Sequence, residues 1–343
     1  MTNQWREFLT HRNARPGDDG HVRFPEQADP GDSRLFDLSH LGLIAVRGAD
    51  AETFLQGQLT NDIRAVTTTH TQLSGYCSQK GRLLASFRVM RIADVIYLQT
   101  PAERVSEVLK RLRIFILRSK VTLEDASHDL IRLGIAGAGS ADLLAAQGLT
   151  LPARDNDAVS HGNLTVVRLS GPLPRGEILG PFPAISQLWD RLASQAIPAN
   201  HADWRLLDIQ AGIPTIYDQT VESFVPQMIN LQLIDGVSFQ KGCYTGQEVV
   251  ARMQHLGKIK RRMYLAEVAS PRSPQPGDEL YSASSTSQQA AGRVVDSAPL
   301  GPERHALLAV VEISAVENGE IRLGEQGPIL SLKAPPYGIG HKL

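Results

Sequence analysis

Cys243 has the strongest chemical setting of any residue in this chain, within the stretch FQKGCYTGQEVVAR. Thr245 and Glu248 have the spacing of a capping box directly before an apolar run, which predicts a helix that begins at Gly246. The helix N-terminus and the ammonium group of Lys241 would both favour the thiolate, so we expect a lowered pKa for the cysteine. The pattern predicts a functional thiol. The competing interpretation is a cysteine buried in a loop.

The other candidate motifs are weak. Cys77, the second of only two cysteines, lies in GYCSQKG and is expected to be an inert packed thiol or an exposed free one. Two cysteines exclude a disulfide framework and an all-cysteine metal cage within one chain. The ten histidines lack ligand spacing, and GxxxxGK[ST], HExxH, GxSxG and CxxC are absent, so we predict no metal site. The stretch GAGSAD imitates a dinucleotide fingerprint, but Asp142 occupies a position that needs a small residue, which favours an ordinary strand-to-helix turn.

Two groups of basic residues stand out from the rest of the chain. They are Lys110, Arg111, Arg113, Arg118 and Lys120, and then Arg252, His255, Lys258, Lys260, Arg261 and Arg262. One interpretation is that they are solvated faces of helices and strands. The other is a local rim that attracts a polyanion, such as an oligoglutamate tail or RNA.

Composition narrows the class of protein. The chain has 343 residues, 42% of them hydrophobic, and its 35 Lys and Arg against 36 Asp and Glu give a net charge of −1. At about 150 residues per domain, two or three domains are expected. Near-neutral charge argues against strong binding of bulk nucleic acid or of a membrane surface. With no long apolar run and no apolar core of a signal peptide at the N-terminus, we expect a cytoplasmic protein.

The pattern of elements predicts an α+β protein. Residues 1–32 are rich in Pro, Gly and Asp and are expected to form a flexible lead-in. Residues 33–256 mix strand and helix patterns without the regularity of a doubly wound parallel sheet, which favours an α+β body. Thr100 begins a predicted capping box with Pro101 at the first helical position, and apolar residues at helical spacing continue to Ile116. Strands are predicted at 41–46, 83–89, 95–98, 121–123, 130–135 and 164–169, and helices after Asp50, after Ser140, and at 185–195 and 204–211.

The C-terminal part differs in character. Within residues 257–343 the composition shifts at Pro271, and short β-like segments alternate with turn signals such as Asn318-Gly319. This pattern predicts a small barrel or sandwich.

The stretch KGCYTGQE, residues 241–248, resembles the signature of the YgfZ-type folate-binding proteins. FLQGQLTND at 54–62, SKVT at 119–122, and DIQAGIP at 208–214 followed by FVPQMINL at 224–231 agree with that family in the same order. The resemblance implies a three-domain ring, in which two mixed α+β (ferredoxin-like) domains and a C-terminal β-barrel surround a central channel. It also implies tetrahydrofolate, or a one-carbon-substituted folate, as the cofactor. The implied role is in assembly or repair of iron–sulfur enzymes, with those enzymes or assembly proteins as partners and an indirect link to tRNA modification.

The resemblance also implies roles for individual residues. Cys243 and Lys241 would form the reactive pair. Trp204 matches a folate-contacting tryptophan of the family, and an indole could stack on a pterin or benzoyl ring. The remaining folate contacts would come from Tyr244 and Gln247 and from Gln210, which stands where the wider superfamily has a pterin-binding Glu. The family's other folate-contacting tryptophan is Leu41 here.

Two alternative functions remain open. One is a folate-dependent aminomethyltransferase or demethylase that acts on a small amine. It is disfavoured because Ala85 and Ser86 stand where the aminomethyltransferase has an acidic pair, and neither can replace a general base. The other is an interaction scaffold that kept the fold and lost the ligand.

Overall fold

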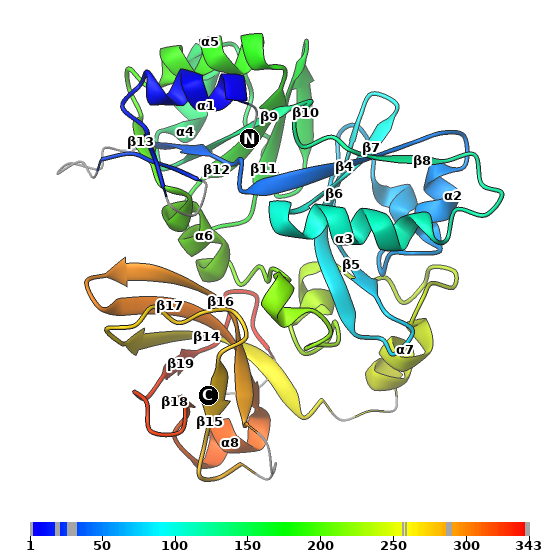
Figure 1. Cartoon of the computed structure of the whole chain (residues 1–343), viewed down its shortest axis with the longest axis vertical. Coiled ribbons are helices and arrows are strands. Elements are labelled where there is room, and N and C mark those ends of the chain that lie inside the picture. Colours follow the sequence, from blue (N-terminus) through cyan, green and yellow to red (C-terminus); the bar gives the residue numbers. More distant parts are fainter. Residues whose placement is uncertain are drawn as a thin grey trace. The chain divides into compact units, whose positions relative to one another are not determined.

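The computed structural model describes residues 3–17, 21–25, 33–255, 257, 259–285 and 290–339. The chain forms two compact units (Figure 1). Unit 1 comprises residues 1–51, 64–72 and 88–204, and unit 2 comprises 52–63, 73–87 and 205–343. The expected division at 33, 256 and 257 into a lead-in, two interwoven domains and a barrel is not tested by this partition and stays a prediction.

A five-stranded antiparallel sheet runs in the order β5-β6-β7-β4-β8. Its strands are β4 (Leu41–Arg47), β5 (Gln72–Cys77), β6 (Leu83–Ile92), β7 (Val95–Pro101) and β8 (Thr122–Asp125). Helix α3 (Ala102–Arg113) packs on β4 and β8. Strands β4, β6 and β7 match the predicted strands at 41–46, 83–89 and 95–98, since a strand buried on both faces needs apolar residues at most positions. The mostly exposed β8 overlaps the predicted strand at 121–123, and β5 was not predicted.

Helix α3 differs from the prediction at both ends. Pro101 is the N-cap, and no side chain caps the helix, so the predicted capping box at Thr100 is wrong. At the other end, Ile114 and Phe115 donate backbone hydrogen bonds to residues three positions earlier, which closes the helix before the predicted Ile116. The apolar Ile114, Phe115 and Leu117 that follow are exposed.

A second sheet, whose strands all belong to unit 1, has six strands in the order β10-β11-β12-β9-β3-β13, and only β13 and β3 pair in parallel. The strands are β3 (Arg34–Asp37), β9 (Ile131–Ala136), β10 (Ala158–His161), β11 (Leu164–Leu169), β12 (Arg175–Gly180) and β13 (Ile197–Ala199). Helices α4 (Ser140–Ala146) and α5 (Phe182–Leu192) contribute to the core on this sheet. The stretch GAGSAD leads from β9 into α4, which confirms the predicted strand-to-helix turn.

The N-terminal segment contains folded elements where a flexible lead-in was expected. Helix α1 (Asn3–Thr10) lies beside α5 (Figure 1), and β1 (Arg15–Pro16) pairs with β2 (Val22–Arg23). Trp5 is fully buried, stacks on Phe8 with ring centroids 5.0 Å apart, and donates its indole N–H to Asp37 at 2.9 Å. The spacing Trp5-Phe8-Leu9 gives the helix one apolar face, and this signal outweighs the Pro- and Gly-rich composition that follows it.

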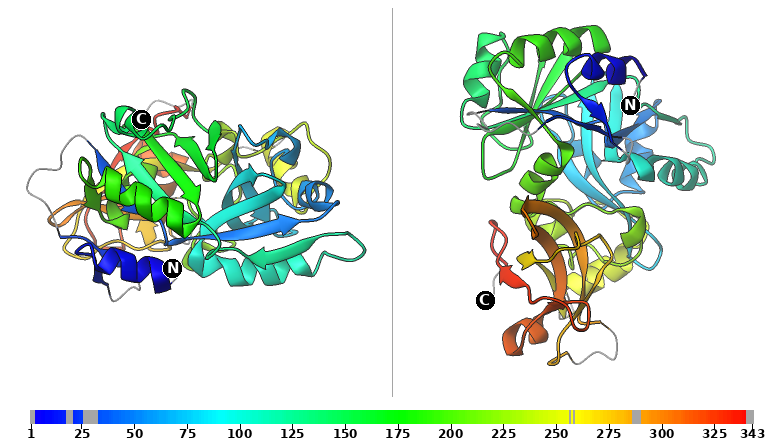
Figure 2. Two further views of the ribbon diagram at one scale, coloured as in Figure 1. Left: turned by 90° about the horizontal axis from the view of Figure 1, so that it is seen from above. Right: turned by 60° about the vertical axis from the view of Figure 1, so that its left-hand side comes forward.

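Unit 2 contains the third sheet, with strands in the order β18-β15-β16-β17-β14-β19, all antiparallel. They are β14 (Arg261–Ala269), β15 (Glu279–Tyr281), β16 (Gly292–Gly301), β17 (Arg304–Glu312), β18 (Arg322–Leu323) and β19 (Ser331–Lys333), with α8 (Ile313–Asn318) after β17. The sheet curls into a half-barrel (Figure 2). The α+β class is thus confirmed, whereas a closed barrel and a three-domain ring stay predictions.

The remaining elements are α2 (Ala51–Gln56), η1 (Ile63–Ala65), α6 (His201–Gln210), η2 (Asp218–Thr220), η3 (Leu231–Ile234) and α7 (Gln247–His255). None of the helices in the described part of the chain is long and apolar enough to cross a membrane.

Candidate functional site

Two of the segments singled out in the sequence, 54–62 and 241–248, meet in unit 2 at the ammonium group of Lys241. This side chain is buried, and its Nζ donates to the carbonyl oxygens of Gln56 at 2.7 Å, Leu59 at 2.5 Å and Asn61 at 3.1 Å. An ammonium group has three N–H donors, and three carbonyls accept from it here. The Nζ atom also lies 5.0 Å from the centroid of the Tyr244 ring, in a cation–π geometry. Lys241 therefore anchors its own loop to the chain that leaves α2.

The stretch 54–62 is fixed further by two polar side chains that sequence reasoning did not single out. The Thr60 hydroxyl donates to the Gly236 carbonyl at 2.7 Å and accepts from the Gly75 N–H at 2.7 Å. The Asn61 amide donates to the carbonyls of Asp235 at 2.6 Å and Leu73 at 3.0 Å. Both residues belong to the stretch 54–62 that resembles the family, and this was the signal from which they could have been found. Through Thr60 and Asn61, this stretch is bonded to the backbone of β5 and of residues 235–236.

Gly246 connects the loop of Lys241 to the turn that precedes β6. Its φ is +81°, and a Cβ built on it would lie 2.3 Å from the Ser78 carbonyl oxygen. Only glycine fits such an approach. Helix α7 begins one residue after the predicted start, and within the described chain no capping hydrogen bond is made by the Thr245 hydroxyl. Glu248 instead pairs with Arg252 one turn on at 3.0 Å, so the predicted capping box is wrong.

Cys243 is exposed between these anchors. The neighbouring Gly242 has no atom within 4 Å of the position its Cβ would take, so the loop is open on this side, whereas Gly246 packs against Ser78 and leaves no such opening. Cys77 is fully buried at the end of β5, and burial raises the pKa of its thiol to about 12. This confirms an inert packed thiol. The roles of Cys243 and Lys241 in chemistry stay predictions.

Thiol labelling should separate the two cysteines. We expect one of the two to react with an aromatic disulfide reagent at pH 8 in the native protein, because a thiol with a pKa of about 12 is ionised to only about 1 part in 10⁴ at that pH. Absorbance of the released thiol counts the reactive groups. Cys243→Ser should leave no fast reaction, and fast labelling of that variant would contradict the burial of Cys77.

Tyr244 lies on the inner side of the loop and is 7% exposed. Burial raises the pKa of its phenol above the usual range. A raised pKa means that the folded state keeps the proton after the unfolded chain has lost it, so this tyrosine supports stability below about pH 10 and the support fades above that pH.

Tyr244→Phe should therefore flatten the alkaline loss of stability. We expect its free energy of unfolding to equal that of the wild type at pH 8 and to exceed it by about 1 kcal/mol at pH 11, where an unfolded tyrosine is largely ionised. Urea titration at both pH values measures this. An equal loss of stability in the variant and the wild type would contradict it.

The predicted folate contacts are divided between the units. Trp204 belongs to the part of α6 in unit 1, where it is 1% exposed, lies 5.1 Å from the Phe36 ring and is covered by the Arg175 guanidinium. Gln210 ends α6 in unit 2 and is half-buried. Gln247, also half-buried, begins α7 behind Tyr244. Their assignment to folate stays a prediction.

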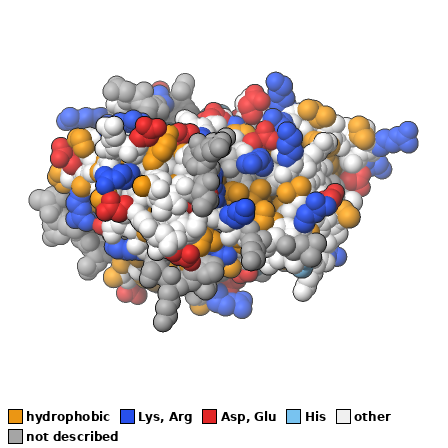
Figure 3. All heavy atoms as spheres, turned by 90° about the horizontal axis from the view of Figure 1, so that it is seen from below, with side chains coloured by type: hydrophobic (Ala, Val, Ile, Leu, Met, Phe, Trp, Pro, Cys, Tyr) orange, Lys and Arg blue, Asp and Glu red, His pale blue; other side chains and the backbone are white. Residues whose placement is uncertain are grey.

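Positions 85 and 86 offer no general base. Ala85 is buried, and the Ser86 hydroxyl accepts the backbone N–H of Ile216 at 3.0 Å. Within the described residues, no group of three or more His, Cys, Asp or Glu side chains could hold a metal ion. Lys258 of the second basic group lies outside the described residues. On the face shown in Figure 3, basic and acidic side chains are interspersed.

A buried ionic network in unit 2 was not expected from the sequence. Asp296 on β16 is 1% exposed and accepts from the Arg205 Nε atom at 2.5 Å, the Tyr217 hydroxyl at 3.1 Å and the Ser297 N–H at 2.7 Å. Burial opposes the charge of Arg205, but the Asp296 carboxylate outweighs it and raises the pKa of the guanidinium. Burial and the same carboxylate raise the pKa of Tyr217. The network ties α6 to the half-barrel sheet.

Comparison with known proteins first defines the class. Residues 31–171 match the family model of the GCVT N-terminal domain. The crystal structure of the glycine cleavage system aminomethyltransferase T from Bartonella henselae is similar over 98% of both chains, with a TM-score of 0.75 and 17% identity. The chain therefore has the fold of an aminomethyltransferase T.

The closer relatives narrow this class to one family. The tRNA-modifying protein YgfZ of Yersinia enterocolitica is 30% identical over 306 residues, which are 89% of this chain and 92% of that protein. The tRNA-modifying protein YgfZ of Colwellia psychrerythraea is 34% identical over 242 residues, which are 71% of this chain and 74% of that protein. The chain belongs to the YgfZ family, which confirms the resemblance inferred from its motifs.

Proposed function

We propose that this protein binds tetrahydrofolate, or a one-carbon-substituted folate, and assists the assembly or repair of iron–sulfur enzymes in the cytoplasm. Enzymes that modify tRNA would be among its clients, and Cys243 would be the functional thiol. Relatives named tRNA-modifying proteins support the link to tRNA. The observation that carries the proposal is the exposed Cys243 on a loop whose base is fixed by the buried Lys241.

Gln210 and Trp204 differ in how well their side chains could contact a folate. The Gln210 amide makes no hydrogen bond among the described residues, and an amide can both donate to and accept from a pterin ring. Trp204 offers no open face, since Phe36 and Arg175 pack against its indole. Gln210 is therefore the better starting point for a test of folate binding.

The role of the thiol is tested in a strain that lacks this protein. We expect Cys243→Ala to restore the activity of an iron–sulfur tRNA-modifying enzyme at least about tenfold less well than the wild type, because the reactive group is gone. Cys77→Ala, which alters the buried thiol, is the matched control and should restore activity. Full restoration by Cys243→Ala would refute the role.

Folate binding is measured separately by anaerobic titration calorimetry with tetrahydrofolate. Removing the amide in Gln210→Ala should weaken binding about fivefold, the usual effect of one lost hydrogen bond. The exposed Gln195→Ala is the control. Absence of saturable binding up to millimolar ligand would refute the folate part and favour a scaffold.

A further inference from the structure

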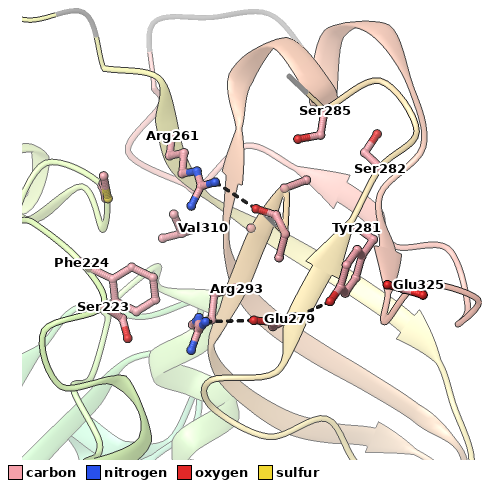
Figure 4. Close-up of a pocket in the computed structure, with 14 residues that line it drawn as sticks. Ser223, Phe224, Arg261, Glu279, Tyr281, Ser282, Ser285, Arg293, Val310 and Glu325 are labelled. Carbon is pink, nitrogen blue, oxygen red and sulfur yellow. Dashed lines mark hydrogen bonds and ion pairs between the residues drawn. The ribbon is translucent and has the colours of Figure 1, made fainter. Parts of the chain in front are cut away.

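Unit 2 contains a pocket of about 720 Å³ on the half-barrel sheet, and its lining does not include Cys243 or Lys241 (Figure 4). Arg261 of β14, Arg293 of β16 and Glu279 and Tyr281 of β15 form its polar wall, and Ser223 and Phe224 come from the segment after η2. This volume is within the range of small-molecule sites.

The two arginines of the pocket differ in their partners. Arg293 pairs with Glu279 at 3.2 Å, and the Tyr281 hydroxyl donates to the same carboxylate at 2.6 Å. The Arg261 guanidinium donates to the carbonyl of Ala290 at 2.9 Å, and among the described residues it has no carboxylate partner. Glu325, the other acidic residue of the lining, is exposed, so solvent screens its charge. The half-buried Arg261 thus makes no ion pair among the described residues, and the buried Glu312 is its register partner on β17.

Apolar side chains also contribute to the lining. Phe224 and Val310 are each 2% exposed to solvent and belong to the core of unit 2, so the half-buried Met228 is the apolar side chain with surface left for a ligand. Figure 4 shows the Phe224 ring and the Arg261 guanidinium on the same side of the pocket. A half-buried arginine that makes no ion pair among the described residues, with Met228 in the same lining, suits a molecule that has an acidic group and a small apolar part.

The segment that contains Ser223 and Phe224 is held in place by the chain that also supports the thiol loop. Arg82 donates to the carbonyls of Glu222 at 3.0 Å and Ser223 at 3.1 Å, and the Leu83 N–H donates to the Phe224 carbonyl at 2.8 Å. Arg82 belongs to the turn after Ser78, against which Gly246 packs. This part of the lining is therefore held in place by the protein alone, which lowers the entropic cost of binding a ligand.

We propose that this pocket binds an organic anion, with its carboxylate or phosphate paired to Arg261 and its apolar part beside Met228. The proposal goes beyond the function proposed above, because its ligand need not be a folate. Two probes separate the sources of the anion. They are p-aminobenzoyl-tri-γ-glutamate, which carries carboxylates, and AMP, which carries a phosphate.

Calorimetric titration of the full chain with each probe tests the proposal. We expect saturable binding of at least one probe, weakened about tenfold or more in Arg261→Gln, which can still donate to Ala290 but has lost the charge. Arg304→Gln, on the exposed pair with Glu267, should bind like the wild type. Ser223→Asp adds a negative charge to the wall and should also weaken binding.

Failure of this proposal can be told apart from failure of the proposed function. The proposed function is tested by titration with tetrahydrofolate and by the enzyme activity that Cys243→Ala restores. Preference for the glutamate probe would assign carboxylate chemistry, and preference for AMP would assign phosphate chemistry. No saturable binding of either probe at millimolar concentration would overturn the proposal. Equal affinity of Arg261→Gln and the wild type, with circular dichroism showing that both proteins are folded, would also overturn it.

Discussion

Arg205→Met is expected to lower the free energy of unfolding by about 3–5 kcal/mol. The substitution removes the guanidinium that lies 2.5 Å from Asp296, and Asp296 is 1% exposed. Removing one partner of a buried ion pair leaves an uncompensated charge in the interior, which is among the largest single effects on stability. Tyr217 still donates to the carboxylate but cannot neutralise it.

The measurement needs a signal from unit 2. All three tryptophans, Trp5, Trp189 and Trp204, lie in unit 1, so circular dichroism must accompany fluorescence in the urea titration. Arg272→Met, on an exposed pair with Asp278, is the control and should cost about 0–1 kcal/mol. Adding Asp296→Asn to Arg205→Met should recover part of the loss. A loss below about 1 kcal/mol for Arg205→Met, or independent effects of the two substitutions, would show that the pair is not coupled.

This network illustrates what the sequence could not predict. Arg205 and Asp296 are 91 positions apart, and Lys241 and Gln56 are 185 apart. Periodicity describes neighbours along one element, so it carries no information on which distant polar groups meet. The strands were predictable for the opposite reason, since β4, β6, β7, β9 and β11 are apolar runs whose burial depends on local composition.

The candidate site was predictable in part because it lies within a compact motif. The residues that flank Cys243 indicated an open, exposed thiol, and the structure confirms the exposure. The function of Lys241 as an anchor was hidden, because the acceptors are backbone carbonyls, which any residue type supplies. Helix α1 was missed because the composition of 1–32 outweighed a short apolar face at Trp5 and Leu9.

The anchor leads to the second large expected effect. Lys241→Met keeps the apolar stem and removes the ammonium, so three carbonyls lose a charged donor at once. The contact to Leu59 is buried, whereas those to Gln56 and Asn61 are partly open to water and can be rehydrated. We therefore expect a loss of about 2–4 kcal/mol in the free energy of unfolding, dominated by the buried carbonyl.

Urea titration followed by circular dichroism measures this loss, and Lys80→Met is the matched control, since Lys80 is exposed in the turn that contacts the loop. The control should change stability by less than about 0.5 kcal/mol. Lys241→Arg should fall between the two, because a planar guanidinium keeps the charge but cannot direct three N–H groups to carbonyls spaced for an ammonium. Wild-type stability in Lys241→Met would contradict the anchoring role of Lys241. The expected loss would instead assign it to holding the loop that presents the thiol.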